Sequence, residues 1–227
     1  MTKASIPCVC FLVLFTSFVQ AKDRPPVICF PFDGTNTNKG SLHYPISFEG
    51  DDIRFRPGMR NEAVFIGGSN DWIDVAVDDA LVFQDGVTLE FWFMRDNWEN
   101  PYKGGSGWQT LVSVDGLCGN VTAPGCPSHV PWTIEGSVSQ YPNVPDQKQV
   151  RMESAEGLVL PDTWYHVALV YDPSDEEALL YVDGSLVDTK SQAPKPEGKR
   201  VNPLRIGTWY KTNQAFRGRI DELRLYD

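Results

Sequence analysis

The sequence has few cysteines and histidines, and after residue 21 it has no long apolar run. Five of the 227 residues are cysteine and three are histidine. A membrane-spanning helix needs about 20 consecutive apolar residues, so residues 22–227 offer no span. The histidines stand far apart, at positions 43, 129 and 166, and no Ser–His–Asp site can be assembled from them.

Basic residues are also in the minority. The chain has 20 Lys and Arg against 30 Asp and Glu, a formal net charge of −10. Nucleic acids and anionic membranes are bound chiefly through basic residues. The composition therefore disfavours both partners, and it is compatible with calcium and with neutral glycans.

The first 21 residues are typical of a secretory signal peptide. Lys3 supplies the positive charge near the N-terminus, and residues 6–19 are apolar. The apolar run ends at Val19-Gln20-Ala21, with small residues at the positions that a signal peptidase recognises. We predict a signal peptide over 1–21, a secreted product and one domain over 22–227. An uncleaved N-terminal anchor is the alternative.

Helical periodicity is missing throughout. Segments that alternate apolar and polar residues occur instead, bounded by Gly, Pro, Asn and Asp. They predict eleven strands, at 27–32, 63–66, 72–77, 88–94, 110–114, 132–135, 149–153, 164–171, 178–182, 204–207 and 219–226, with loops at 96–107, 117–131 and 190–203. This pattern predicts an all-β chain folded as a two-sheet antiparallel sandwich.

The clearest segment is a pair of strands interrupted by turn residues. Residues 164–171 alternate, Asp172-Pro173 opens an acidic turn, and the alternation resumes over 178–182. Asp183-Gly184 then marks a second, two-residue turn. We expect an antiparallel hairpin in the core, with its acidic residues exposed to solvent.

The order and spacing of several motifs resemble a known family. They are FPFDG (30–34), WYHVALVYD (164–172), LYVDGSLV (180–187), LRIG (204–207) and FRGRIDELRLY (216–226). Together they resemble the laminin-G-like jelly roll, in the branch of the concanavalin A-like lectin/glucanase superfamily that includes pentraxin-like domains. The resemblance covers residues 27–227 and implies a jelly-roll sandwich in which Trp164 and His166 are structural.

The resemblance also implies a structural calcium ion where the first and last strands meet. Its ligands would include Asp33 of FDGTN and Asp221 of RIDEL. Calcium takes six to eight oxygen ligands from carboxylates and carbonyls. The alternative is that Asp33 is a turn residue and Asp221 pairs with a nearby arginine.

Aromatic residues in and beside loop 96–107 are the candidate ligand contacts. Trp98, Tyr102 and Trp108 lie among Asn, Asp and Gln residues, and such a mixture suits a sugar, whose CH faces stack on rings while its hydroxyls form hydrogen bonds. The alternative is that these rings fill the core or pack under the loop.

The next loop carries two further candidate sites. Cys118 and Cys126 are close enough in sequence for a disulfide in an oxidising compartment, and Asn120 begins the glycosylation sequon Asn120-Val121-Thr122.

The paired carboxylates of glucanases are missing. These enzymes carry the pattern E-x-D-x-x-E on one strand, which this sequence does not contain. We therefore predict a secreted, non-catalytic recognition module that binds carbohydrate with a structural calcium. An extracellular protein–protein adhesion module is the alternative, followed by a relative of glycoside hydrolases or lyases.

Overall fold

The structure, a computed structural model, describes residues 24–68, 70–81, 83, 85–97, 108–114, 116–122, 132–140, 148–196, 203–209 and 214–227. These residues form fifteen strands and no helix. Consequently none of the described residues belongs to a helix long and apolar enough to cross a membrane. The predicted signal peptide, residues 1–21, lies outside the described residues.

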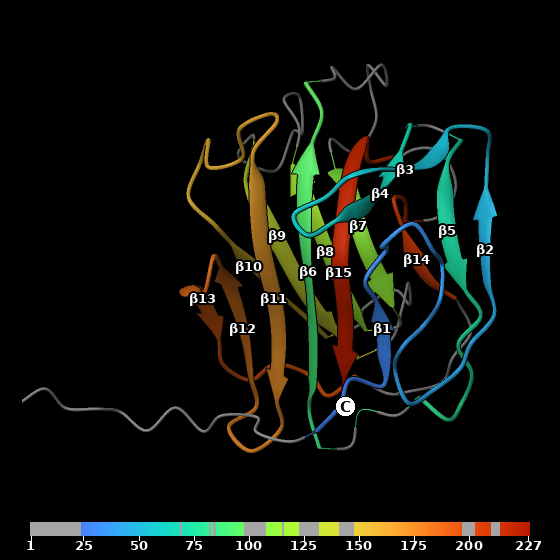
Figure 1. The fold of residues 1–227 in the computed structure, drawn as a ribbon. Coiled ribbons are helices and arrows are strands. Elements are labelled where there is room, and N and C mark those ends of the chain that lie inside the picture. The colour runs from blue at the N-terminus through green and yellow to red at the C-terminus, as the bar shows by residue number, and fades with distance from the viewer. Residues whose placement is uncertain are drawn as a thin grey trace, which may run out of the picture.

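Two antiparallel sheets face one another (Figure 1). The first has eight strands, with β1 (Ile28–Phe30) paired to β15 beside the main path. That path is β13 (Ser185–Lys190), β12 (Glu177–Val182), β11 (Trp164–Asp172), β6 (Val87–Arg95), β15 (Gly218–Tyr226), β4 (Glu62–Ile66) and β3 (Ile53–Pro57).

The second sheet has seven strands. Their order is β10 (Gln149–Glu153), β9 (Ile134–Ser139), β8 (Leu117–Thr122), β7 (Trp108–Val114), β14 (Leu204–Ile206), β5 (Trp72–Val75) and β2 (Ile46–Glu49). Strands distant in sequence, such as β7 and β14, are neighbours here. The predicted all-β, two-sheet sandwich is confirmed.

The core lies between the sheets and follows the period of two. In β11, Tyr165, Val167, Leu169 and Tyr171 are buried, and each buried side chain contributes about 1.5–3 kcal/mol. The sheets approach closely at Gly136 of β9, where an added Cβ atom would clash with Leu169 Cδ2. A larger residue at 136 would displace the Leu169 side chain.

The predicted hairpin is present. Strands β11 and β12 pair antiparallel from Val167↔Val182 to Asp172↔Glu177. Asp183 and Gly184 both have positive φ, 49° and 76°, as a type I′ turn requires. The Asp183 carboxylate accepts a hydrogen bond from the His166 backbone N–H at 2.8 Å.

All eleven predicted strands overlap observed ones, but four observed strands were not predicted: β2, β3, β8 and β13. Strand β8 corrects the predicted loop 117–131, whose first six residues are paired on both sides. Its sequence, LCGNVT, offers Gly and Asn where a strand is usually apolar or β-branched. Gly119 faces Phe91 and Leu169 in the core, where a Cβ atom would be crowded, and Asn120 belongs to the site on this sheet.

Candidate functional site

A pocket opens on the outer face of the seven-stranded sheet. Its volume is about 200 Å³, and it is lined by Trp108, Asn120, Glu135, Ser137, Gln149, Arg151, Trp209 and Gln214. Pockets for drug-sized ligands usually measure about 300–1,000 Å³. This one therefore suits a small ligand, such as the end of a chain of sugar residues.

Strand alternation explains why these side chains point outward. In β9, Ile134 and Val138 belong to the core, while Glu135 and Ser137 point to the other face and line the pocket. In β8, Leu117 and Val121 are core residues and Asn120 faces the pocket. The pocket floor is thus made by the polar side of buried strands.

Glu135 joins two of the lining residues. Its Oε2 atom accepts a hydrogen bond from Trp108 Nε1 at 3.2 Å, and its Oε1 atom accepts one from Asn120 Nδ2 at 3.3 Å. Glu135 is only 2% exposed. A buried carboxylate held by two donors fixes the orientation of the Trp108 indole and of the Asn120 amide.

The same network continues to Gln214. Thr110 Oγ1, which is buried, lies 2.9 Å from Asn120 Oδ1 and 3.0 Å from Gln214 Oε1. The Thr110 backbone N–H also donates to the Gln214 carbonyl oxygen at 2.9 Å. Residues from β7, β8 and β9 and from the segment after β14 are therefore linked through side chains.

A cation–π contact covers part of the aromatic wall. The Arg151 guanidinium carbon lies 5.0 Å from the centroid of the Trp108 ring. The lining thus combines two tryptophans, one acid, one base, three amides and a hydroxyl. Aromatic faces beside several hydrogen-bonding groups are what a sugar requires.

The structure places one predicted ligand residue, Trp108, in this pocket. Trp98 and Tyr102 lie outside the described residues. Asn120 was predicted only as a glycosylation acceptor, and no motif in the sequence predicts a site at Glu135, Ser137, Gln149, Arg151, Trp209 or Gln214. The alternation of polar residues in 135–137 and 149–151 was the available signal.

The predicted glycosylation site lies inside the pocket. Asn120 is 6% exposed and its Nδ2 atom donates to Glu135. A glycan on Nδ2 would replace one of the two amide protons and fill the pocket. An occupied sequon and an open pocket therefore exclude one another, and glycosylation stays a prediction.

Cys118 lies directly below this network. Its Sγ atom is 3.3 Å from Asn120 Oδ1. Burial, together with the charge of Glu135, raises the pKa of the Cys118 thiol well above its ordinary value, so the thiol stays protonated. Cys126 lies outside the described residues, and the disulfide remains a prediction.

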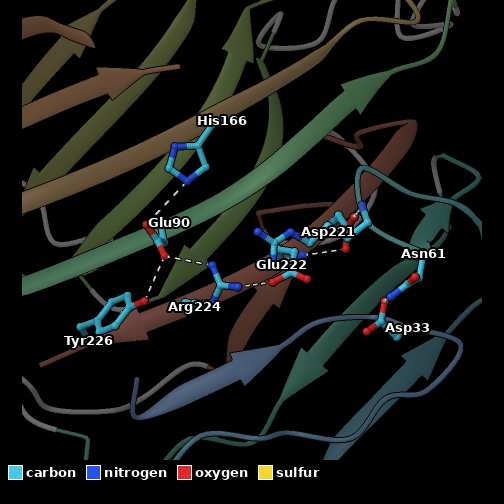
Figure 2. Close-up of polar contacts among 9 residues, drawn as sticks. Asp33, Asn61, Glu90, His166, Asp221, Glu222, Arg224 and Tyr226 are labelled. Atoms are coloured by element: carbon cyan, nitrogen blue, oxygen red, sulfur yellow. Dashed lines mark hydrogen bonds and ion pairs between the residues drawn. The ribbon is translucent and has the colours of Figure 1, made fainter. Parts of the chain in front are cut away.

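The two aspartates predicted to bind calcium both hold the turn between β3 and β4 (Figure 2). Asp33 Oδ1 accepts a hydrogen bond from Asn61 Nδ2 at 3.1 Å. Asp221, which is fully buried, accepts bonds from the backbone N–H groups of Arg60 and Glu222, at 3.0 and 2.8 Å. Burial raises the Asp221 pKa to about 6.

The donor set fits calcium incompletely. Both Asp221 oxygens face amide protons, and no cluster of three Asp, Glu, His or Cys residues that suits a metal occurs within the described ranges. The remaining oxygens would have to come from backbone carbonyls and water. In the described part of the chain no arginine forms an ion pair with Asp221 either, so neither reading of this residue is confirmed.

A second polar cluster lies on the outer face of the eight-stranded sheet (Figure 2). Glu90 accepts hydrogen bonds from Arg224 at 3.3 Å and Tyr226 at 3.0 Å, and its other oxygen is 3.6 Å from His166 Nε2. These partners outweigh burial and lower the Glu90 pKa. His166, whose ring contacts Trp92, belongs to this half-buried structural network.

Comparison of the sequence with known families gives one match. Residues 67–227 match the family described as the concanavalin A-like lectin/glucanases superfamily, through its laminin-G-type model. A search of curated proteins found no match.

Solved structures with this fold include binding domains from several sources. The binding domain of Paraclostridial Mosquitocidal Protein 1 has a TM-score of 0.68 and 13% identity, covering 89% of this chain and 48% of the other. The receptor-binding domain of botulinum neurotoxin C/D mosaic serotype has a TM-score of 0.64, with 13% identity and the same coverage. This chain thus spans about half the length of these two domains.

A third structure is matched over nearly its whole length. It is domain 4 of AbnA, an extracellular arabinanase of family GH43 from Geobacillus stearothermophilus, in complex with arabinotriose. The TM-score is 0.61 and the identity 16%, covering 89% of this chain and 92% of that domain. At these identities the likeness shows a shared fold.

Proposed function

The chain belongs to the concanavalin A-like lectin/glucanases superfamily, and from this membership and the pocket we propose that it is a non-catalytic, carbohydrate-binding module. The observation that carries the proposal is the pocket lined by Trp108, Trp209 and six polar side chains. One comparable domain was solved with arabinotriose and others are receptor-binding domains. Recognition is a common use of this fold.

The pocket chemistry supports binding of an uncharged sugar. Glu135 and Arg151 bring one charge of each sign, and Glu135 is already held by two donors. The tryptophan rings offer surfaces for stacking, while the amides and Ser137 offer donors and acceptors for hydroxyl groups. A ligand with a net charge would leave one of the charged side chains poorly matched.

The same geometry argues against hydrolysis. Retaining glycosidases need two carboxyl groups about 5–5.5 Å apart, one acting as acid and one as nucleophile. Glu135 is the single carboxylate among the described residues that line the pocket. Its oxygens bind Trp108 and Asn120, toward β7 and β8. Its cross-strand neighbour Glu153, on β10, is not among the residues that line the pocket.

Protein–protein adhesion is the second candidate. Leu186 and Val187 of the edge strand β13 are 52% and 39% exposed. An edge strand with exposed apolar residues can pair with another chain. The receptor-binding domains among the similar structures favour this alternative as well.

A glycan array separates the two candidates. The purified protein is applied to the array in buffer with calcium and again with EDTA. The Glu153→Gln variant, which loses a carboxylate that does not line the pocket, is the control. Binding that follows one family of neutral glycans supports the proposed function, and arabinotriose is the first soluble competitor to use. A protein that binds no glycan, yet is retained by cells after their glycans are removed, overturns it in favour of adhesion.

Secretion and calcium are parts of the same proposal. The signal-like residues 1–21 support an extracellular location, where glycans are abundant. Calcium is proposed as an ion that stabilises the β3–β4 turn beside Asp33 and Asp221. The support is that a buried carboxylate, costly without a compensating cation, holds this turn.

A further inference from the structure

We propose that Glu135 sets the direction of the hydrogen bonds that lead through Asn120 and Thr110 to Gln214, and makes Gln214 present its carbonyl oxygen to the ligand. The inference rests on the proposed carbohydrate function where it names the ligand group that Gln214 meets. The direction of the hydrogen bonds is a property of the protein alone. The direction follows from which groups can donate a proton and which can only accept one, along the contacts from Trp108 to Gln214.

The first two members of the network have fixed roles. The indole N–H of Trp108 can only donate, and an ionised Glu135 can only accept. Asn120 must therefore turn its NH₂ group toward Glu135, because its carbonyl oxygen would repel the carboxylate. This agrees with the 3.3 Å contact from Asn120 Nδ2 to Glu135 Oε1.

The next step is set by the single hydroxyl proton of Thr110. Asn120 Oδ1 faces Thr110 Oγ1 at 2.9 Å, so the hydroxyl donates to it. Thr110 has no second proton for Gln214, whose amide lies 3.0 Å away. The contact is a hydrogen bond only when Gln214 turns its NH₂ group toward Thr110.

Gln214 then presents its carbonyl oxygen on the other side of the amide. Since Gln214 lines the pocket, this oxygen is available to accept a hydrogen bond from the ligand. The matching ligand group is a donor such as a sugar hydroxyl. An ether or glycosidic oxygen in the same place would meet a second acceptor and bind poorly.

Replacing Glu135 by Gln reverses the network. Trp108 still needs an acceptor, so the new amide turns its oxygen to the indole and its NH₂ to Asn120. Asn120 then turns its own NH₂ to Thr110, Thr110 donates to Gln214 Oε1, and Gln214 presents NH₂ to the pocket. The single substitution at residue 135 thereby exchanges an acceptor for a donor at Gln214, which is linked to residue 135 through Asn120 and Thr110.

Nuclear Overhauser contacts in isotope-labelled protein report the orientation of the Gln214 side-chain amide directly. In the wild type we expect a contact between the Gln214 side-chain NH₂ and the Thr110 γ-methyl group. In Glu135→Gln this contact falls several-fold, and affinity for the best glycan of the array falls about tenfold or more. Glu153→Gln is the matched control, since Glu153 pairs with Glu135 across the strands and does not line the pocket.

The inference is wrong if the contact is missing in the wild type, or if it is unchanged in folded Glu135→Gln. Should that variant not fold, Thr110→Val removes the relay, and the Gln214 NH₂ protons should then exchange with solvent at least tenfold faster. Unchanged exchange overturns the inference. If no glycan or arabinotriose binds while the contacts are as expected, the proposed function fails and the direction of the hydrogen bonds stands.

Discussion

Trp108 and Glu135 are 27 positions apart in sequence, yet the indole N–H of Trp108 donates to the Glu135 carboxylate at 3.2 Å. Strand β8 lies between their strands and contributes Asn120 to the same carboxylate. The Trp108 ring in the pocket wall is therefore held by a buried acid from another strand. This link makes the site rigid before a ligand arrives, which reduces the entropy lost on binding.

The buried Asp221 carboxyl should make stability depend on pH. Its folded pKa is about 6, above the ordinary 3.8, so the folded state binds the proton more tightly than the unfolded state. The stabilising contribution is complete below about pH 3.8 and is lost as the pH rises to about 6. The shift corresponds to at most about 3 kcal/mol.

Urea unfolding from pH 4 to 7.5 measures this effect. The difference in unfolding free energy between the wild type and Asp221→Asn should change by about 2–3 kcal/mol across that range. Asp33→Asn, which removes a half-buried carboxylate that contacts the same turn through Asn61, is the control measured over the same pH range. Parallel curves for the wild type and Asp221→Asn would show that Asp221 has an ordinary pKa.

Calcium should raise the melting temperature if it binds beside this turn. We expect EDTA to lower the melting temperature of the wild type by several degrees at pH 7.5, and calcium in excess to restore it, because a ligand that binds only the folded state stabilises it. Asp221→Asn should lose most of the response. A melting temperature unaffected by EDTA counts against the ion.

The Glu90 cluster should stabilise the eight-stranded sheet without affecting the pocket. Glu90→Gln weakens the contacts to His166, Arg224 and Tyr226, and we expect a loss of about 1–3 kcal/mol at pH 7. Because the folded pKa of Glu90 is lowered, this contribution is present above pH 4.5 and disappears as the pH falls below it. Asp175→Asn, in the exposed β11–β12 turn, should change stability by less than about 0.5 kcal/mol.

Much of the fold is predictable from local sequence, while the site is not. The β11–β12 hairpin is encoded by its own alternation and by the turn residues Asp172, Pro173, Asp183 and Gly184, so its prediction is confirmed. The sequence predicts a loop where strand β8 lies, because Gly119 and Asn120 are poor strand formers. Gly119 has only the space that Phe91 leaves, and Asn120 serves the pocket.

The pocket depends on pairings that no local pattern reveals. Trp209 and Gln214 reach it because β14 lies beside β7, although 89 residues separate those strands in sequence. Asp33 and Asp221 were expected to share one ion through family resemblance. In the structure each binds a different residue of the β3–β4 turn, and the shared ion stays a prediction.

Glycosylation provides a further test of the pocket. Protein secreted from eukaryotic cells should carry little or no glycan at Asn120, because the folded strand buries that amide and binds it to Glu135. Peptide mass spectrometry measures the occupancy. A fully occupied Asn120 in protein that still binds glycans would contradict the assignment of this pocket.

The affinity of Trp108→Ala for the best ligand of the glycan array, measured by titration calorimetry, tests the central claim most directly. Removing the ring that faces the pocket should weaken binding about tenfold or more, since tenfold is about 1.4 kcal/mol and aromatic contacts commonly reach that size. Trp72→Ala, on the same sheet face outside the pocket, should leave the affinity within twofold. Equal affinities for the wild type and Trp108→Ala, with both proteins folded, would show that sugars do not bind at this pocket.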